Sequence, residues 1–425
     1  MVGVIVPSSY SLEQILSEKQ IHHVVKQSIA GDVPWLLVGC EVKPATDGLA
    51  GFLGDHFRII LRLRLGEDLR SIYLFLKHLP ITNKPKAEII DKFNYFRREV
   101  LMYKLLEEMG PHNADPNPWC CKAFIYTDTK IVMPDLAIKS YSSRDFRETL
   151  DLPHMLLTAT SLARFHAAFT NYETKKSLNE KRPYSTYQEN TNTLTEPTLC
   201  DSPWLRACPK LTVNLLAAFS TKFKHDIPDL ESKLSKLYLE ACESFKEETD
   251  TLNVLVHKDL WINNILFKYK NSTPVNAVLV DFQCIRYGPP AFDVMSFLYL
   301  TTSKKFRDQH EREILLHYYK IFFDNLDIFS KQRLERLGYN EVEFLTWCER
   351  SRMFGAFASI GYFPFTLMDP KTAQKTFDDP ETYEKYLYED RSEPVIAHAK
   401  ICSVYRERQL EVSEEFVERY VLKNS

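Results

Sequence analysis

The segment FRIILRLRL at 57–65 places the tightest constraint on how this chain can fold. Apolar residues occupy every second position, and arginines occupy most of the positions between them. Successive side chains of a β-strand point to opposite faces, so this alternation predicts a strand with one buried and one solvated face. The segments 35–43 and 72–79 predict two further strands, and a glycine-rich turn at 48–54 follows the first. Strands in this order predict a small antiparallel sheet near the N-terminus.

Helical patterns dominate the rest of the chain. We expect a leading helix at 11–30, another helix at 88–108 and mainly helical structure from Pro153 onward. Two short strands are expected at 122–128 and 130–136. The fold class that follows is α+β, with a sheet-bearing part before a mostly helical part.

The stretch 171–205 interrupts this helical region. It is rich in Asn, Thr, Ser, Glu and Lys and lacks periodicity, so we expect a long surface insertion. Beyond about residue 300 the pattern is again helical nearly throughout, with many aromatic residues.

Composition narrows the classes of function. A length of 425 residues suits two lobes with additions, and 44% apolar with 26% charged residues is typical of a soluble globular protein. A formal net charge of −3 without a basic stripe argues against a nucleic-acid surface. No signal peptide or run of roughly 20 apolar residues is visible. Nine unpatterned cysteines indicate reduced thiols, so we expect a cytoplasmic protein. No obligate protein partner is evident in the sequence.

The strongest chemical signal is VLVHKDLWINNILF at 254–267, followed by AVLVDFQ. His257, Asp259 and Asn264 have the spacing H-x-D-x4-N of a kinase catalytic loop. In such a loop the carboxylate orients the attacking hydroxyl, and the amide a few residues later holds a metal ion. Asp281 ends the next apolar strand, where it could bridge Mg²⁺ to phosphates. These residues together predict phosphoryl transfer.

Lys77 and Glu99 form a second candidate pair. Lys77 ends a strand that is apolar on both faces, so its ammonium is expected to be partly desolvated and to need an anion. Glu99 lies at the edge of the apolar face of the next predicted helix. A strand lysine held by a helix glutamate is the arrangement that directs the lysine at nucleotide phosphates.

The glycine-rich turn is a weaker candidate for a phosphate site. Gly48, Gly51 and Gly54 could let backbone amides approach phosphates, and Gly51 and Gly54 are the candidate cofactor-binding residues of this turn. Their spacing is not G-x-G-x-x-G, and a simple turn explains them nearly as well.

The segment MPDL at 133–136 is positioned to pass adenine between two lobes. Pro134 has no amide hydrogen, so the donor to the adenine edge would come from Asp135 or Leu136.

Three other polar residues are interpreted as structural. Asp293 precedes a helix and is expected to cap it or to brace the catalytic loop. His166 lies among apolar neighbours and is interpreted as a core histidine. His257 is interpreted as a brace for the loop rather than a proton carrier.

At these residues the chain resembles the ecdysteroid-kinase-like, or CHK-kinase-like, proteins of arthropods, which are related to choline kinases and aminoglycoside phosphotransferases. The resemblance spans roughly residues 35–400. The features that support it are LFLKHLP with Lys77, the pattern F-x2-E-x3-Y at Phe96, Glu99 and Tyr103, HKDLWINNILF, and VDFQ followed by PPAFDVMSFLY.

The resemblance implies a bilobal protein-kinase-like fold. We expect a small antiparallel-sheet lobe at 1–132, a hinge at 133–140 and a mostly helical lobe at 141–425 that holds the catalytic loop and the acceptor pocket. It also implies ATP- and Mg²⁺-dependent phosphorylation of a hydroxyl on an ecdysteroid or a similar lipophilic metabolite, such as a xenobiotic. By the same resemblance Asp259 is the catalytic base, while Asn264 and Asp281 are metal ligands.

The chain departs from the family pattern at two positions. The family usually has Gly where this chain has Lys258, so the backbone of the loop could differ. Pro134 replaces an acidic residue at the start of the hinge, which bears on nucleotide affinity. Neither departure removes a catalytic group.

Three other functions compete with this interpretation. A protein kinase is disfavoured because Gln283 replaces the Gly of Asp-Phe-Gly and no Ala-Pro-Glu follows. A non-catalytic nucleotide-binding protein predicts loss of catalytic residues that are all present here. A choline or ethanolamine kinase stays open, because an aromatic cage, an apolar slot and plain core packing would each account for the aromatic residues Trp347, Phe354, Phe357, Tyr362, Phe363 and Phe365.

Overall fold

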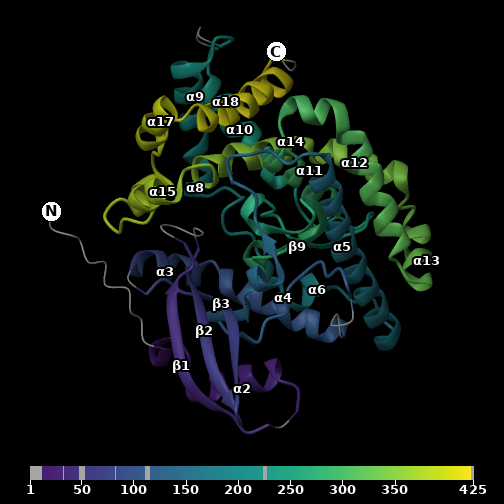
Figure 1. Ribbon diagram of the computed structural model, residues 1–425. Helices are drawn as coiled ribbons and strands as arrows, with labels where there is room; N and C mark the ends of the chain where they lie inside the picture. The colour runs from purple at the N-terminus through teal and green to yellow at the C-terminus, as the bar shows by residue number, and fades with distance from the viewer. Residues whose placement is uncertain are drawn as a thin grey trace, which may run out of the picture.

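A five-stranded antiparallel sheet forms the N-terminal part of the protein, in the strand order β1-β2-β3-β5-β4 (Figure 1). The computed structural model describes residues 12–31, 33–46, 53–81, 83–110, 115–223 and 227–422. The strands are β1 (Leu36–Pro44), β2 (Asp55–Leu65), β3 (Asp68–His78), β4 (Ile125–Tyr126) and β5 (Lys130–Pro134). The predicted antiparallel sheet is therefore confirmed, although the strand expected at 122–128 is only two residues long.

The alternation in β2 separates the two faces of this sheet. Phe57, Ile59, Leu61 and Leu63 are buried in one apolar cluster with residues of two short helices, α1 (Leu12–Ile15) and α2 (Glu18–Ser28). The opposite face borders a cavity, which is lined from β2 and β3 by His56, Arg58, Phe75 and Lys77. Because β2 pairs with β3 in register, His56 lies across from Lys77 and Arg58 across from Phe75.

Two predicted helices are each divided into two. The leading helix breaks before Ser17, whose side chain and that of Gln20 accept each other's backbone amides in a capping box that starts α2. The helix expected at 88–108 is α3 (Lys84–Lys92) followed by α4 (Tyr95–Met109). Asn94 separates them with a left-handed backbone (φ 59°), which an α-helix cannot continue through.

A short connection leads from the sheet to the helical part of the chain. It contains a 3₁₀ turn, η1 (Leu136–Lys139), and the short strand β6 (Tyr141–Ser142). β6 joins β8 (Ile265–Lys270) and β9 (Thr273–Leu279) in one small sheet, while β7 (Val254–Val256) pairs with β10 (Arg286–Gly288) in another. The catalytic-loop sequence thus connects these two small sheets, between β7 and β8.

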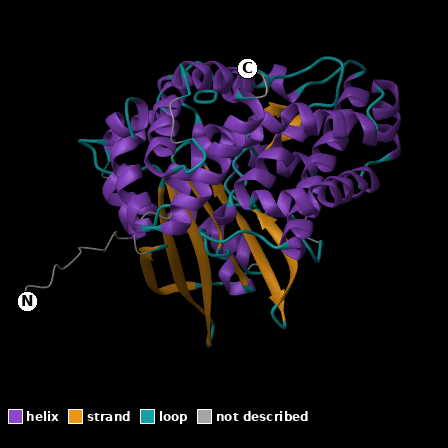
Figure 2. Ribbon diagram, turned by 90° about the horizontal axis from the view of Figure 1, so that it is seen from above, coloured by secondary structure: helices purple, strands orange, loops and turns teal. Residues whose placement is uncertain are grey.

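Helices make up most of the remainder and lie on one side of the N-terminal sheet (Figure 2). The buried helix α11 packs against the long helix α14, and α5 packs against β9 and α12. The helices are α5 (Leu152–Glu180), α6 (Thr186–Glu189), α7 (Thr191–Leu194), α8 (Pro203–Arg206), α9 (Cys208–Phe219), α10 (Leu230–Glu243), α11 (Pro290–Thr301), α12 (Lys304–Asp324), α13 (Ile328–Leu337), α14 (Glu341–Thr366), α15 (Pro370–Phe377), α16 (Tyr383–Tyr388), α17 (Ser392–Ile401) and α18 (Ser403–Phe416).

The prediction of a surface insertion at 171–205 is wrong. Helix α5 continues to Glu180, and three short helices follow it. Several polar side chains of this stretch are buried and used internally, although others are exposed. Glu173, for example, accepts hydrogen bonds from the Thr186 amide (2.8 Å) and the Tyr287 hydroxyl (2.9 Å). The polar composition of this stretch predicted exposure, because composition alone does not show which polar groups form hydrogen bonds inside the protein.

The predicted bilobal α+β fold is confirmed, with a sheet-bearing lobe below and a mostly helical lobe above it in Figure 1. The helical prediction beyond residue 300 is also confirmed. Among the described residues, no helix combines the length and the apolar character needed to cross a bilayer.

Candidate active site

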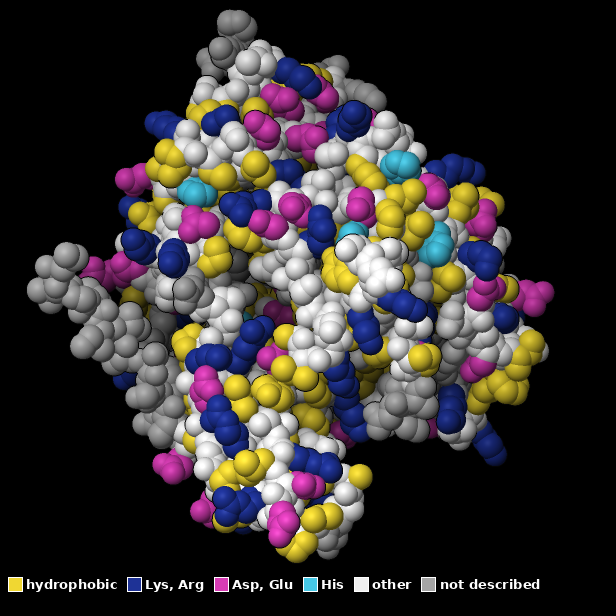
Figure 3. Space-filling model, viewed as in Figure 1, with side chains coloured by type: hydrophobic (Ala, Val, Ile, Leu, Met, Phe, Trp, Pro, Cys, Tyr) yellow, Lys and Arg dark blue, Asp and Glu magenta, His cyan; other side chains and the backbone are white. Residues whose placement is uncertain are grey.

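A cavity of about 480 Å³ lies between the two lobes, and the space-filling view shows the molecule hollowed there (Figure 3). Its sheet side is lined by β2, β3, the connection after β5 and the loop before β8. Its helical side is lined by residues from α3, α8, α14, α15 and α16 and from the start of α4. Asp259, Asn264, Asp281, Lys77 and Glu99, which come from distant parts of the sequence, all line this one cavity.

The catalytic-loop segment is held by buried hydrogen bonds. Asp293 accepts the backbone amides of His257 (2.6 Å) and Lys258 (2.8 Å), one with each carboxylate oxygen. The ring of His257 donates to the Val280 carbonyl (2.9 Å), which ties the loop to the end of the following strand. His166 contacts Asp293 from the other side (3.2 Å). The interpretation of Asp293 and His257 as braces is therefore confirmed.

Loss of the Asp293 carboxylate should destabilise the protein. In Asp293→Ala the amides of His257 and Lys258 stay buried without an acceptor, and each such group costs about 1–3 kcal/mol. We expect the free energy of unfolding to fall by about 3 kcal/mol, measured by urea denaturation. Asp293→Asn keeps one acceptor oxygen and should lose less. A loss below about 1 kcal/mol in Asp293→Ala would contradict this role.

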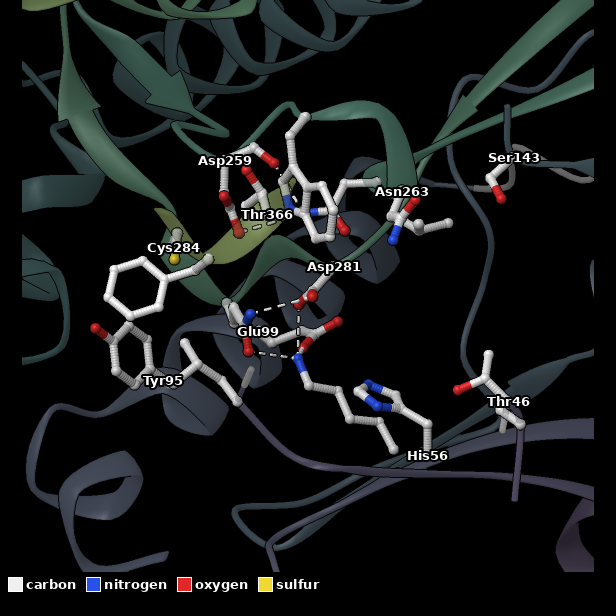
Figure 4. Close-up of a pocket in the computed structure, with 18 of the residues that line it drawn as sticks. Thr46, His56, Tyr95, Glu99, Ser143, Asp259, Asn263, Asp281, Cys284 and Thr366 are labelled. Atoms are coloured by element: carbon white, nitrogen blue, oxygen red, sulfur yellow. Dashed lines mark hydrogen bonds and ion pairs between the residues drawn. The ribbon is translucent and has the colours of Figure 1, made fainter. Parts of the chain in front are cut away.

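Lys77 forms the centre of a buried polar cluster. Its Nζ donates to Glu99 Oε2 (2.7 Å), Asp281 Oδ1 (2.6 Å) and Gln283 Oε1 (2.7 Å). Glu99 and Asp281 are labelled in Figure 4. Lys77 is 2% exposed and Glu99 is fully buried, so the pair is shielded from water. Gln283 in turn donates to Asp281 Oδ2 (3.1 Å). The expected Lys77–Glu99 pair is thus present, and Gln283, which was not among the predicted site residues, completes it.

Asp259 and Asn264 lie next to each other. The Asn264 side-chain nitrogen donates to the Asp259 carbonyl oxygen (2.8 Å) and to its carboxylate (3.2 Å). In Figure 4 the Asp259 carboxylate lies beside Thr366 and points toward the space between Cys284 and Asp281. Asp259 can therefore contact a molecule that occupies the helical side of the cavity.

The ionisable groups of the site are strongly perturbed by burial. Burial, reinforced by the nearby Asp281 carboxylate, raises the pKa of Asp259 to about 8. Burial also raises the pKa of Glu99 to about 7, against the opposing effect of Lys77. Burial alone would lower the pKa of Lys77, but Asp281 and Glu99 raise it above its ordinary value. Burial and Lys77 lower the pKa of His56 to about 4, so its imidazole is neutral near pH 7.

The oxygen ligands present fit a magnesium ion. Asp281 offers a carboxylate, and Asn264 offers its amide oxygen because its amide nitrogen is directed at Asp259. Within the described part of the chain, no cluster of three or more His, Cys, Asp and Glu side chains is suited to a metal. Mg²⁺ generally binds through one or two carboxylates together with water and phosphate oxygens, so a set of two residues suffices.

The hinge prediction is met only in part. The amide of Asp135 donates to the Tyr73 carbonyl (3.0 Å), because pairing with β3 continues past the end of β5. Its carboxylate accepts from the Ala137 amide (3.0 Å) and lies 3.3 Å from Arg58 Nε. Asp135 and Leu136 both line the cavity, but the Asp135 amide is not free to bind a base.

The glycine turn is only partly described. Gly48 and Gly51 lie outside the described residues. Gly54 has a φ of 147°, and a Cβ there would be 3.0 Å from the His78 carbonyl oxygen. The glycine at position 54 therefore lets the chain pass close to the end of β3, directly beside Lys77.

The helical side of the cavity is aromatic and comes from both lobes. The ion pair between Lys86 Nζ and Asp378 Oδ1 (2.8 Å) and the hydrogen bond from Asn83 to the Asp378 carbonyl (2.9 Å) fasten the start of α3 to the segment after α15. Of the aromatic residues that the sequence left unassigned, Tyr362 and Phe365 line the cavity, while the other four are buried in the core. The lining residues on this side are Ile89, Phe93, Tyr95, Thr198, Trp204, Cys284, Tyr362, Phe365, Thr366, Phe377, Tyr383, Leu387 and Tyr388.

Comparison with known families agrees with the resemblance noted in the sequence. A family model described as the ecdysteroid kinase-like family matches residues 49–330, more than half of the chain. The chain belongs to the ecdysteroid kinase-like family. The match includes Lys77, Glu99, Asp259, Asn264 and Asp281 but ends before α14, so much of the aromatic wall lies outside it.

One curated relative is an uncharacterized kinase-like protein of Caenorhabditis elegans, 25% identical over 194 residues, or 45% of this chain and 47% of the relative. The chain therefore spans about half the length of this curated relative.

Among solved structures, an ADP-bound aminoglycoside phosphotransferase is 15% identical with a TM-score of 0.37, covering 94% of this chain and 99% of the other. A choline kinase from Streptococcus pneumoniae is 12% identical with a TM-score of 0.36, covering 89% and 99%. A choline kinase from Cryptosporidium parvum is 10% identical with a TM-score of 0.36, covering 94% and 99%.

Proposed function

We propose that this protein is a phosphotransferase that uses ATP and Mg²⁺ to phosphorylate a hydroxyl group of a small, uncharged, lipophilic molecule, such as an ecdysteroid or a xenobiotic metabolite. The observation that supports it most is the meeting of Lys77, Asp281, Asn264 and Asp259 in one cavity. Membership of the ecdysteroid kinase-like family supports the same reaction class.

In this proposal each residue has a separate task. Lys77, held by Glu99, binds the α- and β-phosphates of the nucleotide, and Leu136 offers its amide to the base. Asp281 and Asn264 hold the metal, and a bound Mg²⁺ would neutralise charge on the phosphate oxygens. Asp259 accepts the proton of the attacking hydroxyl in its ionised form. Because its pKa is raised to about 8, the fraction of Asp259 able to accept a proton grows as the pH rises from 7 toward 8.

The charge of the cavity wall favours an uncharged acceptor. The charged residues that line the cavity are Arg58, Lys77, Glu99, Asp135, Asp259 and Asp281. All of them lie on the sheet side or in the catalytic segments except Glu99, which lies on α4 and is paired with Lys77. Recognition of a quaternary ammonium by an aromatic cage is generally assisted by carboxylates, and the aromatic side contributes none from its described residues.

A buried cation next to two of the aromatic lining residues also favours an uncharged acceptor. The Arg391 guanidinium is fully buried and lies 5.3 Å from the ring of Trp204 and 5.2 Å from that of Phe365. Both rings line the cavity, so a second cation bound against them would lie near the Arg391 charge and be repelled by it. Choline, ethanolamine and aminoglycosides are therefore the less favoured acceptors.

The proposal is tested by competition between acceptor classes. Purified protein with Mg-ATP would be offered equal amounts of a hydroxylated steroid, a plant phenolic, choline and ethanolamine, with products identified by mass spectrometry. We expect phosphorylation of a neutral acceptor. Phosphorylation of choline or ethanolamine in preference would favour the alternative kinase, and failure of Mg-ATP to bind would favour a non-catalytic protein.

Tyr362 gives a test of the acceptor wall. In Tyr362→Ala the KM for the acceptor should rise about tenfold, because burying an aromatic side chain against a ligand contributes about 1.5–3 kcal/mol. Tyr362→Phe should stay near wild type, and the KM for ATP should change little in both. An unchanged acceptor KM in Tyr362→Ala, measured by steady-state kinetics, would place the acceptor elsewhere.

We also propose a cytoplasmic location. All nine cysteines lie in the described part of the chain and are unpaired there, as expected for a reducing compartment.

A further inference from the structure

Glu196 is a buried carboxylate at the junction of several segments of the candidate site. Its side chain is 7% exposed. Oε2 accepts from Lys258 Nζ at 2.6 Å and lies 3.7 Å from Arg286 Nη1, while Oε1 accepts the amides of Thr198 (3.0 Å) and Leu199 (2.9 Å). Burial raises the pKa of Glu196, but Lys258 and Arg286 outweigh burial and hold it well below its ordinary value. Glu196 is therefore a charged, fully partnered group.

Lys258, the main partner of Glu196, is the residue immediately before Asp259. It is 2% exposed and has a left-handed backbone (φ 67°), which is unfavourable for a residue with a side chain. Its amide is fixed by Asp293 and its ammonium by Glu196. Because the backbone amide and the side-chain ammonium of Lys258 are both held, the backbone direction at the next residue, Asp259, is fixed as well.

The segment that carries Glu196 is attached to α4 as well. Arg98, which is 1% exposed and directly precedes Glu99, donates through Nε to the Thr193 carbonyl (2.9 Å) and through Nη2 to the Thr195 carbonyl. The Asn94 side chain donates to the Asn192 carbonyl (3.2 Å). The stretch 192–199, here called the bridging segment, thus connects α4 with the catalytic segment.

The bridging segment links the residues proposed to bind the nucleotide phosphates with the residue proposed to act as the base. Glu99 on α4 holds Lys77, and Lys258 precedes Asp259. Arg286, the second cation at Glu196, begins β10, shortly after Asp281 and Gln283. Thr198, at the end of the bridging segment, also lines the cavity. Movement of the bridging segment would therefore reach the phosphate-binding lysine and the catalytic base together.

We propose that Glu196 and Lys258 are positioning residues, whose buried ion pair fixes Asp259 for reaction and couples its position to that of helix α4. This inference rests on the proposed phosphotransferase function. The lysine in place of the family's usual glycine is then a functional part of this chain, supplied with its own carboxylate.

The protein offers a matched control in a second buried ion pair. Arg307 Nη2 lies 2.5 Å from Glu415 Oε2, and their side chains are 4% and 5% exposed. The pair joins α12 to α18, and neither residue lines the cavity. Glu415→Gln therefore removes a buried charge of the same kind without touching the site.

The kinetic test compares Glu196→Gln and Lys258→Met with Glu415→Gln. We expect the first two to lower kcat at saturating ATP about tenfold or more, since misplacing reacting groups by ~1 Å can cost on the order of 10²-fold. The KM for ATP should rise by a smaller factor, because α4 reaches Lys77 only through Glu99. Lys258→Arg keeps a positive charge at this position and, unlike Lys258→Met, should retain most of the wild-type kcat. Glu415→Gln should lower the melting temperature to a similar extent and keep kcat.

A second measurement does not depend on an acceptor. Hydrogen exchange followed by mass spectrometry should show faster exchange at 257–264 and 95–109 in Glu196→Gln, and unchanged exchange there in Glu415→Gln. If no acceptor is phosphorylated by the wild type, the proposed function fails, and this exchange pattern still decides the coupling. Equal exchange and equal kcat in Glu196→Gln and Glu415→Gln would overturn the inference.

Discussion

Asp259→Asn is expected to lower kcat by about 10³-fold, within the range that a positioned general base contributes. The substitution keeps the size of the side chain but removes the carboxylate that we propose accepts the proton of the acceptor hydroxyl. Asn264 still finds the Asp259 backbone carbonyl, to which it donates at 2.8 Å. The loop should therefore keep its shape, and the loss should appear in the chemical step.

Two controls separate this effect from loss of structure. Removing a charge that burial and Asp281 disfavour should leave the free energy of unfolding unchanged or raise it. Mg-ATP affinity, measured by isothermal titration calorimetry, should stay within about threefold of wild type, because in our proposal Lys77 rather than Asp259 contacts the phosphates. A fall in kcat of less than about tenfold would remove Asp259 from the role of base.

Lys77→Met is expected to lower kcat/KM for ATP by about 10²–10³-fold, the loss typical of removing one preorganised electrostatic contact to a reacting group. It should also destabilise the fold. Glu99, which is fully buried, and Asp281 would lose the cation that they share, and breaking a buried ion pair in this way costs about 3–5 kcal/mol. Protonation of Glu99, whose pKa is already raised to about 7, would recover part of that loss.

Arg307→Met is the control for the second effect. It also removes a buried cation from a carboxylate, Glu415, but outside the cavity. Stability should fall in both variants, as measured by chemical denaturation, whereas kcat/KM for ATP should fall only in Lys77→Met. Equal kinetic losses in the two variants would mean that Lys77 acts through stability alone.

Local sequence patterns predicted the sheet and the catalytic segment because their causes are local. The alternation at 57–65 reflects the two faces of β2, and the spacing of Asp259 and Asn264 reflects one short loop. Lys77 and Glu99 could be paired because a desolvated lysine requires an anion and the next helix offered one.

Features that depend on distant partners could not be predicted in the same way. The left-handed Asn94 divides a continuous helical pattern, and nothing in the pattern marks that break. Glu196 lies in a polar stretch that resembles a surface loop, and only the fold brings Lys258 and Arg286 to it. The engaged amide of Asp135 likewise depends on how far β5 pairs with β3.

The acceptor wall was the least predictable part of the site. Tyr362 and Phe365 follow the same helical spacing as the core residues Phe354 and Phe357, because all four lie on α14. Whether such a residue lines a cavity depends on what packs opposite it, here Trp204 on α8 and Phe377 on α15. Helical spacing shows which side of a helix a residue lies on, but it does not show what packs against that side.

The most direct test of the central claim is to follow the phosphoryl group itself. Purified protein would be incubated with Mg-ATP labelled with ¹⁸O in its γ-phosphoryl group and with each acceptor in turn: hydroxylated steroids, plant phenolics, glycosides, choline and ethanolamine. We predict that mass spectrometry will find the label on a hydroxyl of a neutral acceptor, in proportion to the ADP formed, and that the Asp259→Asn protein will transfer it about 10³-fold more slowly. Absence of the label from every acceptor, with wild-type protein that is folded and supplied with Mg-ATP, would contradict the account.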